Sequence, residues 1–366
     1  MDKLRKLTYS VIIILSSFFC VTLSEYAQAE ETGAFTYEVV FPENQHSDQG
    51  YFDLRMTPSQ KQTVQIKLIN MSKDAPVTID VKRNTVKTNS NGVLEYGPNT
   101  IKLDKSAAID FDSLVSVPES VTLAAGETKN LDIEIQMPEQ SFDGVVAGGI
   151  QLEKKDTDED KKKQNKETGV VNKYAFLVGV LLTETDANVE PEITFNSIYP
   201  DLSNYRNAIF VNFSNTQRTF IGDLSVEFEV RKKGSSTVLY DTKKTDMKMA
   251  PTSMMNFPLL LNGNEMQPGD YTGHVVVTSG DKRWEWEEDF EITKEQAEKF
   301  NKQDVSLVQD KGLNWKMILL IVGGVLILVI VILVIIYLYK NRKNKNKKIV
   351  KNKKKAAGNK KKSTKK

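Results

Sequence analysis

The chain contains two histidines, and neither stands in a setting that supports proton transfer. His46 lies in a polar stretch, and His274 lies in a segment that alternates like a β-strand. Hydrolytic triads need a base that titrates near neutral pH beside a nucleophile, and the single cysteine, Cys20, lies in the apolar N-terminal segment. Carboxylates are scattered along segments in which apolar and polar residues alternate, as in β-strands. They are expected to lie on the solvent-exposed face of those strands. These patterns predict a protein that is not an enzyme.

An acidic run has the spacing of a calcium-binding loop. Asp156, Asp158, Asp160 and Glu167 fall at positions 1, 3, 5 and 12 of that register. Position 6, however, is Lys161 where such loops carry glycine, more lysines follow, and no helical pattern flanks the run. Residues 156–168 are therefore expected to form a solvated charged loop, and the chain is expected to hold no metal and no other cofactor.

Aromatic side chains are the candidate binding residues. Trp284 and Trp286 are two apart on an expected strand, so both indoles face one side, where they could stack on sugar rings or pack in a core. We favour the core, because Phe290 and Ile292 continue the pattern inward after a register break near Glu288. Tyrosines near turn signals are the alternative ligand-facing aromatics: Tyr51, Tyr96 and Tyr205.

The expected β-strands, in which apolar and polar residues alternate, are the elements that would position these aromatic residues. Leu131, Ile133 and Ile135 alternate with polar residues, and the segment from Val226 to Val230 does the same. Turns containing Gly, Pro and Asn punctuate the segments at short intervals, without a sustained period near 3.6. The expected fold is all-β, with two tandem immunoglobulin-like β-sandwich domains followed by one C-terminal transmembrane helix.

Internal similarity indicates two copies of one module. The segment from Val64 has an alternating strand, a polar turn that opens with Asn and Ser, and a second strand, and the segment from Ile209 has the same layout. The segments from Leu123 and Met249 also match in pattern. We expect a first domain over residues 34–155 and a second over 169–302, with the alternative that a strand over 170–185 completes the first.

Both ends of the chain have the pattern of targeting or membrane segments. Residues 1–29 carry basic residues, an apolar run and an A-x-A site, as in a signal peptide, with an uncleaved anchor as the weaker alternative. Residues 317–339 are uncharged and long enough, at about 35 Å, to cross a bilayer. Residues 303–315 are expected to form a stalk.

The formal charge is divided between two opposite poles. Residues 340–366 hold 15 Lys and Arg and no acid, whereas residues 30–339 hold 32 basic and 46 acidic side chains, a net charge of −14. The basic tail is expected to be cytoplasmic and to attract anionic lipids, and we expect no nucleic-acid partner. The predicted location is the cell membrane, with a single span and the N-terminal ectodomain outside.

The order of motifs is similar to that of a known family. FTYEVVFPENQ, TNSNGVLEYG, SVPESVTLAAGETK and FDGVVAGGI are followed by NKYAFLVGVLL, PGDYTG, one span and a Lys-rich tail. This order resembles the WxL-interacting proteins of Gram-positive bacteria, from Phe35 to about Leu152 and from about Asn172 to Phe300. The resemblance implies a first domain that binds peptidoglycan and a second that binds host or surface partners, together with secreted WxL-domain proteins.

The resemblance sets the functional expectation. Trp284-Glu285-Trp286 differs from a WxL motif, so the chain is expected to be the partner of a WxL-domain protein rather than one itself. The leading hypothesis is a membrane-anchored surface protein that links peptidoglycan to WxL-domain proteins or host extracellular-matrix ligands. The second is an adhesin whose main ligand is a host matrix protein, and the third is an envelope enzyme or receptor.

Overall fold

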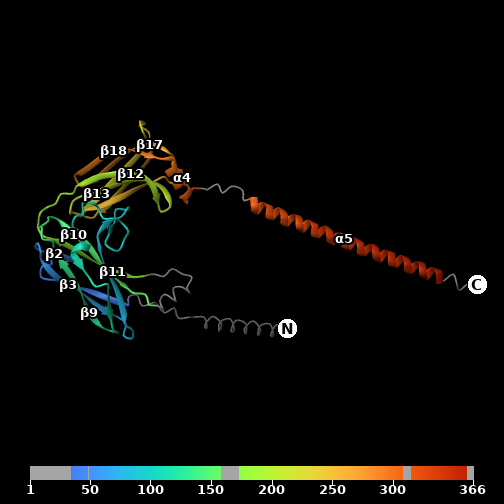
Figure 1. Cartoon of the computed structure of the whole chain (residues 1–366), viewed down its shortest axis with the longest axis horizontal. Helices are drawn as coiled ribbons and strands as arrows, with labels where there is room; N and C mark the ends of the chain where they lie inside the picture. The colour runs from blue at the N-terminus through green and yellow to red at the C-terminus, as the bar shows by residue number, and fades with distance from the viewer. Residues whose placement is uncertain (1–33, 48, 158–172, 308–314, 361–366) are drawn as a thin grey trace, which may run out of the picture. The chain divides into compact units, whose positions relative to one another are not determined.

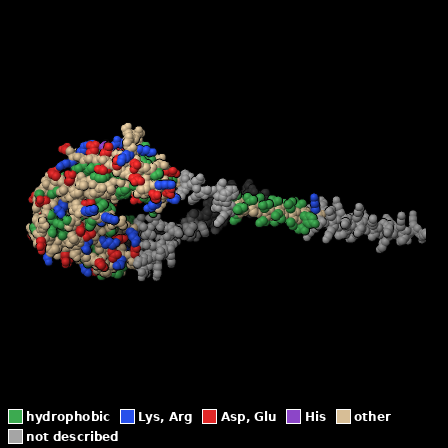
Figure 2. Space-filling model, turned by 45° about the horizontal axis from the view of Figure 1, so that its top comes forward, with side chains coloured by type: hydrophobic (Ala, Val, Ile, Leu, Met, Phe, Trp, Pro, Cys, Tyr) green, Lys and Arg blue, Asp and Glu red, His purple; other side chains and the backbone are tan. Residues whose placement is uncertain are grey.

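The computed structural model describes residues 34–47, 49–157, 173–307 and 315–360 (Figure 1). It separates into a strand-rich unit that ends at Leu307 and a helical unit beyond it. The predicted signal peptide, most of the charged loop, residues 308–314 of the predicted stalk and the last six residues lie outside the described residues. Figure 2 shows acidic and basic side chains interspersed over the surface of the strand-rich unit.

The first β-sandwich has two sheets, as the alternating pattern predicts. One sheet has the order β1 (Phe35–Val40), β3 (Lys61–Asn70), β9 (Thr128–Gln136) and β7 (Val115–Ser116). The other has the order β2 (Phe52–Arg55), β11 (Ala175–Thr183), β10 (Val145–Lys154), β4 (Val77–Thr85) and β8 (Ser120–Leu123). Leu131, Ile133 and Ile135 of β9 are buried between the sheets. The short helix α2 (Phe111–Leu114) adds the buried ring of Phe111 to this core.

β11 lies in the first sandwich, although it follows the charged loop. It pairs antiparallel with β10 and parallel with β2, and it contributes Val178, Val180 and Leu182 to the first core. The strand pairing thus joins β11 to the sheet of the first sandwich, and β12 is the next strand along the chain.

The second β-sandwich repeats the two-sheet plan. One sheet has the order β12 (Ile193–Ser203), β13 (Arg206–Asn215) and β16 (Ser253–Leu260), and the other has β15 (Val238–Met249), β14 (Ile221–Lys232), β17 (Gly269–Ser279) and β18 (Lys282–Ile292). Val226, Phe228 and Val230 are buried, as predicted. A two-stranded hairpin, β5 (Lys87–Thr88) and β6 (Leu94–Glu95), extends from the first sandwich to contact β15 and β16 of the second.

Helix α4 (Lys294–Gln303) closes the second core. Thr293 caps its N-terminus, and Ala297 and Phe300, three residues apart, bury one face of the helix. The backbone continues on the domain, because the Asp304 carboxylate accepts a hydrogen bond of 2.7 Å from the Asn207 N–H and is 1 % exposed. The stalk predicted from residue 303 is thus packed on the sandwich at its beginning.

The helical unit consists of α5 (Trp315–Lys360). Its segment Met317–Leu338 has a mean hydropathy of 3.7, and none of its most apolar window is buried by other residues (Figure 2). At 1.5 Å per residue this segment is long enough to cross a bilayer core of about 30 Å. The apolar C-terminal helix is therefore compatible with a membrane anchor.

Candidate functional site

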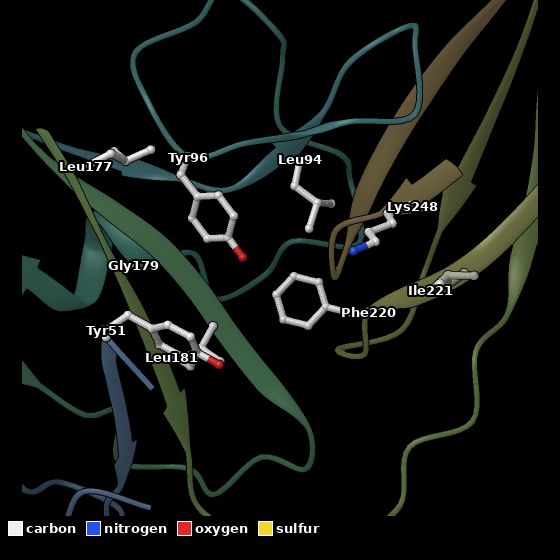
Figure 3. Close-up of a pocket in the computed structure, with 11 residues that line it drawn as sticks. Tyr51, Leu94, Tyr96, Leu177, Gly179, Leu181, Phe220, Ile221 and Lys248 are labelled. Atoms are coloured by element: carbon white, nitrogen blue, oxygen red, sulfur yellow. The ribbon is translucent and has the colours of Figure 1, made fainter. Parts of the chain in front are cut away.

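A cavity of about 650 Å³ lies where the two sandwiches meet (Figure 3). The first sandwich and its hairpin contribute Tyr51, Tyr96 and the side chains of Leu94, Leu177 and Leu181. The second contributes Phe220, Ile221 and Lys248. Two of the candidate tyrosines, distant in the sequence, therefore line one cavity, whose volume lies in the range of small-molecule sites.

Two facing glycines lie next to the two tyrosines, and one of them, Gly149, allows a close approach. Gly149 of β10 and Gly179 of β11 are direct partners across the antiparallel ladder, on the sheet face away from the core. A Cβ on Gly149 would lie 2.6 Å from the Tyr96 carbonyl oxygen, and a Cβ on Gly179 would lie 3.5 Å from the Tyr51 Cβ. Glycine at 149 is therefore needed for Tyr96 to approach the sheet so closely.

The Tyr96 phenol lies in a poorly solvated part of the cavity. Burial raises the pKa of Tyr96 to about 12, and the nearby Tyr51 phenol adds to the increase. Figure 3 shows the Tyr96 hydroxyl directed into the space between Leu94 and Phe220. This hydroxyl is neutral at physiological pH and can donate a hydrogen bond to a ligand.

The second sandwich positions Lys248 through a contact with the hairpin of the first. The Lys248 N–H donates a 2.8 Å hydrogen bond to the carbonyl of Gly92. Gly92 has φ +71°, and a Cβ there would lie 2.4 Å from the Cβ of Met247. Only glycine therefore suits this turn, and the turn brings the Lys248 side chain to the cavity.

Buried hydrogen bonds join the sandwiches beside the cavity. The Thr88 and Ser253 hydroxyls are 2.6 Å apart, and the Ala250 N–H donates a 2.9 Å hydrogen bond to the Thr88 hydroxyl oxygen. Ala250 packs with Val86 and Ala147 of the first sandwich in a small buried cluster. The cavity walls are thus held by contacts from both sides of the joint.

Tyr205 lies apart from the cavity, in the turn between β12 and β13. Its side chain is 72 % exposed, and both Asn204 and Tyr205 have positive φ, +49° and +60°. This backbone conformation is uncommon for a bulky residue. The structure therefore does not bring Tyr205 together with Tyr51 and Tyr96.

Trp284 and Trp286 pack against the second core, as we favoured. Both are half-buried, and the Trp286 and Phe195 ring centroids are 6.0 Å apart. The predicted register break near Glu288 is wrong, because β17 and β18 pair without interruption and Glu288 lies opposite Gly273. β18 is the edge strand of its sheet, and Glu288 is exposed on it. The strand can therefore carry this charge without a change of register.

Other polar groups singled out from the sequence form surface pairs. His274 Nε2 lies 2.7 Å from a carboxylate oxygen of Glu285, and Asp156 forms an ion pair with Lys173. Among the residues that the structure describes, no three His, Cys, Asp or Glu side chains form a group suited to a metal ion. Asp158, Asp160 and Glu167 of the calcium-like register lie outside the described residues.

Sequence reasoning missed Phe220, Lys248 and the glycine pair. Phe220 and Lys248 come from the second sandwich, and a period-two pattern does not say which sheet face meets the neighbouring domain. Gly149 did leave a signal, since glycine inside a strand often marks close approach of another group.

Comparisons with known proteins complete the description of the site. The profile of the WxL Interacting Protein peptidoglycan binding domain matches residues 35–154, and that of the WxL Interacting Protein host binding domain matches residues 165–302. The second match includes β11, which the strand pairing assigns to the first sandwich. No curated protein matches the sequence significantly.

Two of the solved structures that match the chain are bacterial chaperones. The class 5 fimbriae chaperone CfaA is 12 % identical with a TM-score of 0.27, and the match covers 69 % of this chain and 99 % of the chaperone. The E. coli chaperone DraB is 13 % identical with a TM-score of 0.23, and the match covers 65 % of this chain and 94 % of DraB.

Proposed function

Because the chain belongs to the family of WxL-interacting proteins, we propose that it links peptidoglycan to a secreted WxL-domain protein while anchored in the cell membrane. Its two matched domains are of peptidoglycan-binding and host-binding types. In the proposed arrangement the sandwiches lie outside the cell, α5 spans the membrane, and the basic tail faces anionic lipids of the inner leaflet. The protein acts by binding and has no catalytic role.

The observation that carries this proposal is the buried joint between the sandwiches. The Thr88–Ser253 contact and the hydrogen bond from Ala250 leave little freedom between the two domains. A body with two binding domains fixed to one another can hold a wall polymer and a protein partner at a constant separation. Independent domains on a flexible linker would not do so.

A three-component sedimentation assay tests this function. Purified peptidoglycan sacculi are mixed with a secreted WxL-domain protein, with and without the full-length chain in detergent micelles. We expect the WxL-domain protein to sediment only when the chain is present. Binding of the chain to sacculi should depend weakly on salt, because residues 30–339 have a net charge of −14 and gain little from long-range attraction to an anionic wall.

Two results would contradict the linking function. The chain could stay in the supernatant with sacculi alone, or the WxL-domain protein could sediment equally well without it. The name of the second matched domain supports one other candidate, a host-directed adhesin. Retention of the chain on immobilised host matrix protein, together with no binding of the WxL-domain protein, would favour that function.

A further inference from the structure

Three polar groups line the cavity between the sandwiches and are open to a ligand. In the part of the chain that the structure describes, the Tyr51 and Tyr96 hydroxyls and the exposed Lys248 ammonium form no hydrogen bond or ion pair with another protein group. Figure 3 shows the Lys248 nitrogen and the Tyr96 hydroxyl on the cavity side of their elements. The cavity therefore offers three hydrogen-bond donors, one of them charged.

The charge of Lys248 faces a mainly apolar lining. Among the described residues that line the cavity, Lys248 is the only charged one and none is acidic, and the others are glycine, aliphatic and aromatic. The site is thus complementary to a ligand with a negative charge at one end and a mainly apolar face. A single ammonium with two hydroxyls can pair with one carboxylate, and the described lining has no arginine to hold the larger charge of a phosphate.

The walls favour a sugar ring as the body of the ligand. Tyr51, Tyr96 and Phe220 present aromatic rings, whose faces can pack on the C–H face of a pyranose, and the two phenols can bond to ring hydroxyls. The lining residues from β11 and from the second sandwich fall within residues 165–302, which match the host-binding domain. Tyr51, Leu94 and Tyr96 fall within residues 35–154, which match the domain that binds peptidoglycan. Amino sugars that carry a carboxylate are components of that polymer.

We propose that this cavity binds a carboxylate-bearing amino sugar of the wall glycan, with Lys248 pairing with the carboxylate and Tyr51 and Tyr96 bonding to the sugar. The proposal rests on the peptidoglycan binding described above. Lys248 belongs to β15 of the second sandwich. The second sandwich therefore supplies the positive charge, and the first sandwich supplies the two tyrosines that bind the sugar. Glycan binding is therefore a property of the joined pair of sandwiches.

The test compares two disaccharides that differ in the carboxylate. N-acetylglucosaminyl-N-acetylmuramic acid carries a lactyl carboxylate, and N,N′-diacetylchitobiose has similar rings without it. Dissociation constants are measured by titration calorimetry with the full-length chain in detergent micelles. The muramyl disaccharide should bind at least about tenfold more tightly than chitobiose, because a hydrogen-bonded charge pair is lost with the carboxylate.

Variants assign the binding to the cavity. Lys248→Met should weaken binding of the muramyl disaccharide about tenfold and leave chitobiose binding unchanged, whereas Lys248→Arg should keep most of the affinity. Tyr96→Phe removes one hydroxyl and keeps the ring, so it should weaken both disaccharides by about fivefold. Lys129→Met is the matched control, since Lys129 is exposed on β9 and does not line the cavity.

The outcomes separate this proposal from the linking function. Equal affinity for the two disaccharides with no effect of Lys248→Met would overturn the cavity assignment, even if the chain still sediments with sacculi. Binding of decanoate that depends on Lys248, with no binding of the muramyl disaccharide, would also overturn it and identify a fatty-acid site. Failure of the chain to sediment with sacculi would instead refute the function on which the proposal rests.

Discussion

Asn70 and Asn215 make the same pair of hydrogen bonds in the two sandwiches. Each amide ends a strand and donates to two backbone carbonyls, one in the loop that follows its own strand and one in a later turn. The second acceptor is Ala124 at 2.8 Å in the first sandwich and Ala250 at 2.9 Å in the second. Both asparagines are almost fully buried, with 3 % and 0 % exposure. The internal repeat thus extends to individual atoms.

Replacing either asparagine should destabilise its sandwich. Asn215→Ala removes the amide donor from the Thr219 carbonyl and leaves the buried Ala250 carbonyl with only the Ser253 hydroxyl, so we expect a loss of about 2 kcal/mol in the free energy of unfolding, measured by urea denaturation. Asn70→Ala should give a similar loss. The control is Asn130→Ala, which removes an exposed bond to Gln65 and should cost less than about 0.5 kcal/mol. Equal effects of Asn215→Ala and Asn130→Ala would refute this prediction.

The joint between the sandwiches should depend on the Thr88 hydroxyl. Thr88→Val keeps the shape of the side chain but leaves the Ser253 hydroxyl and the Ala250 N–H without this buried partner, so we expect a loss of about 1–3 kcal/mol in unfolding free energy.

An exposed threonine pair provides the control for the joint. Thr78 and Thr122 lie 3.0 Å apart on the surface of the first sandwich, and Thr122→Val should have little effect on stability. Limited proteolysis adds a second measurement. Thr88→Val should speed cleavage between the sandwiches, and unchanged cleavage and stability would show that the hydroxyl does not hold the joint.

Helix α4 should be required for the second sandwich. Phe300 is 6 % exposed in the second core, so Phe300→Ala is expected to lower the unfolding free energy by about 3–5 kcal/mol. Val305→Ala is the control, because Val305 is 70 % exposed beyond the same helix and should cost less than about 0.5 kcal/mol. Thermal melting of both variants decides the matter, and equal melting temperatures would place α4 outside the folded core.

The sequence indicated the sandwiches because a strand with one buried face alternates at period two. The alternation from Leu131 to Ile135 and the Asn-containing turns near residues 70 and 215 are local signals, and the structure confirms both. Helix α4 was harder to assign, because only Ala297 and Phe300 mark its buried face. The sequence pattern therefore places these residues at the end of the second domain but does not show how the helix packs on it.

The cavity could not be predicted for a different reason. Tyr51, Tyr96, Phe220 and Lys248 come from four distant segments, and their meeting depends on how the outer faces of two sandwiches dock. The outer face of a sheet carries polar or mixed side chains, and this pattern does not indicate which domain packs on it. The tyrosines were found because they flank turns, whereas Lys248 had no feature that distinguished it from other surface lysines.

Alkaline titration should single out Tyr96. An unfolded tyrosine has a pKa of about 10, whereas burial raises the pKa of Tyr96 to about 12. The folded protein therefore holds this proton more tightly than the unfolded chain, so the contribution of Tyr96 to stability is complete below pH 10 and is lost as pH rises to 12. The free energy of unfolding of the wild type should fall more steeply with pH in that window than that of Tyr96→Phe.

Urea denaturation at several pH values between 9 and 12 provides the two slopes. At about pH 9 and below the wild type and Tyr96→Phe should differ by a constant amount, because Tyr96 is then protonated in both the folded and the unfolded chain. Asn130→Ala is the control, since it changes no titratable group and removes only an exposed hydrogen bond, and it should keep the wild-type slope. Absorbance of tyrosinate at 295 nm gives an independent check, because Tyr96→Phe should remove a phenol that ionises near pH 12. Parallel slopes for the wild type and Tyr96→Phe above pH 10 would mean that water reaches the phenol and that the cavity is more open than its lining implies.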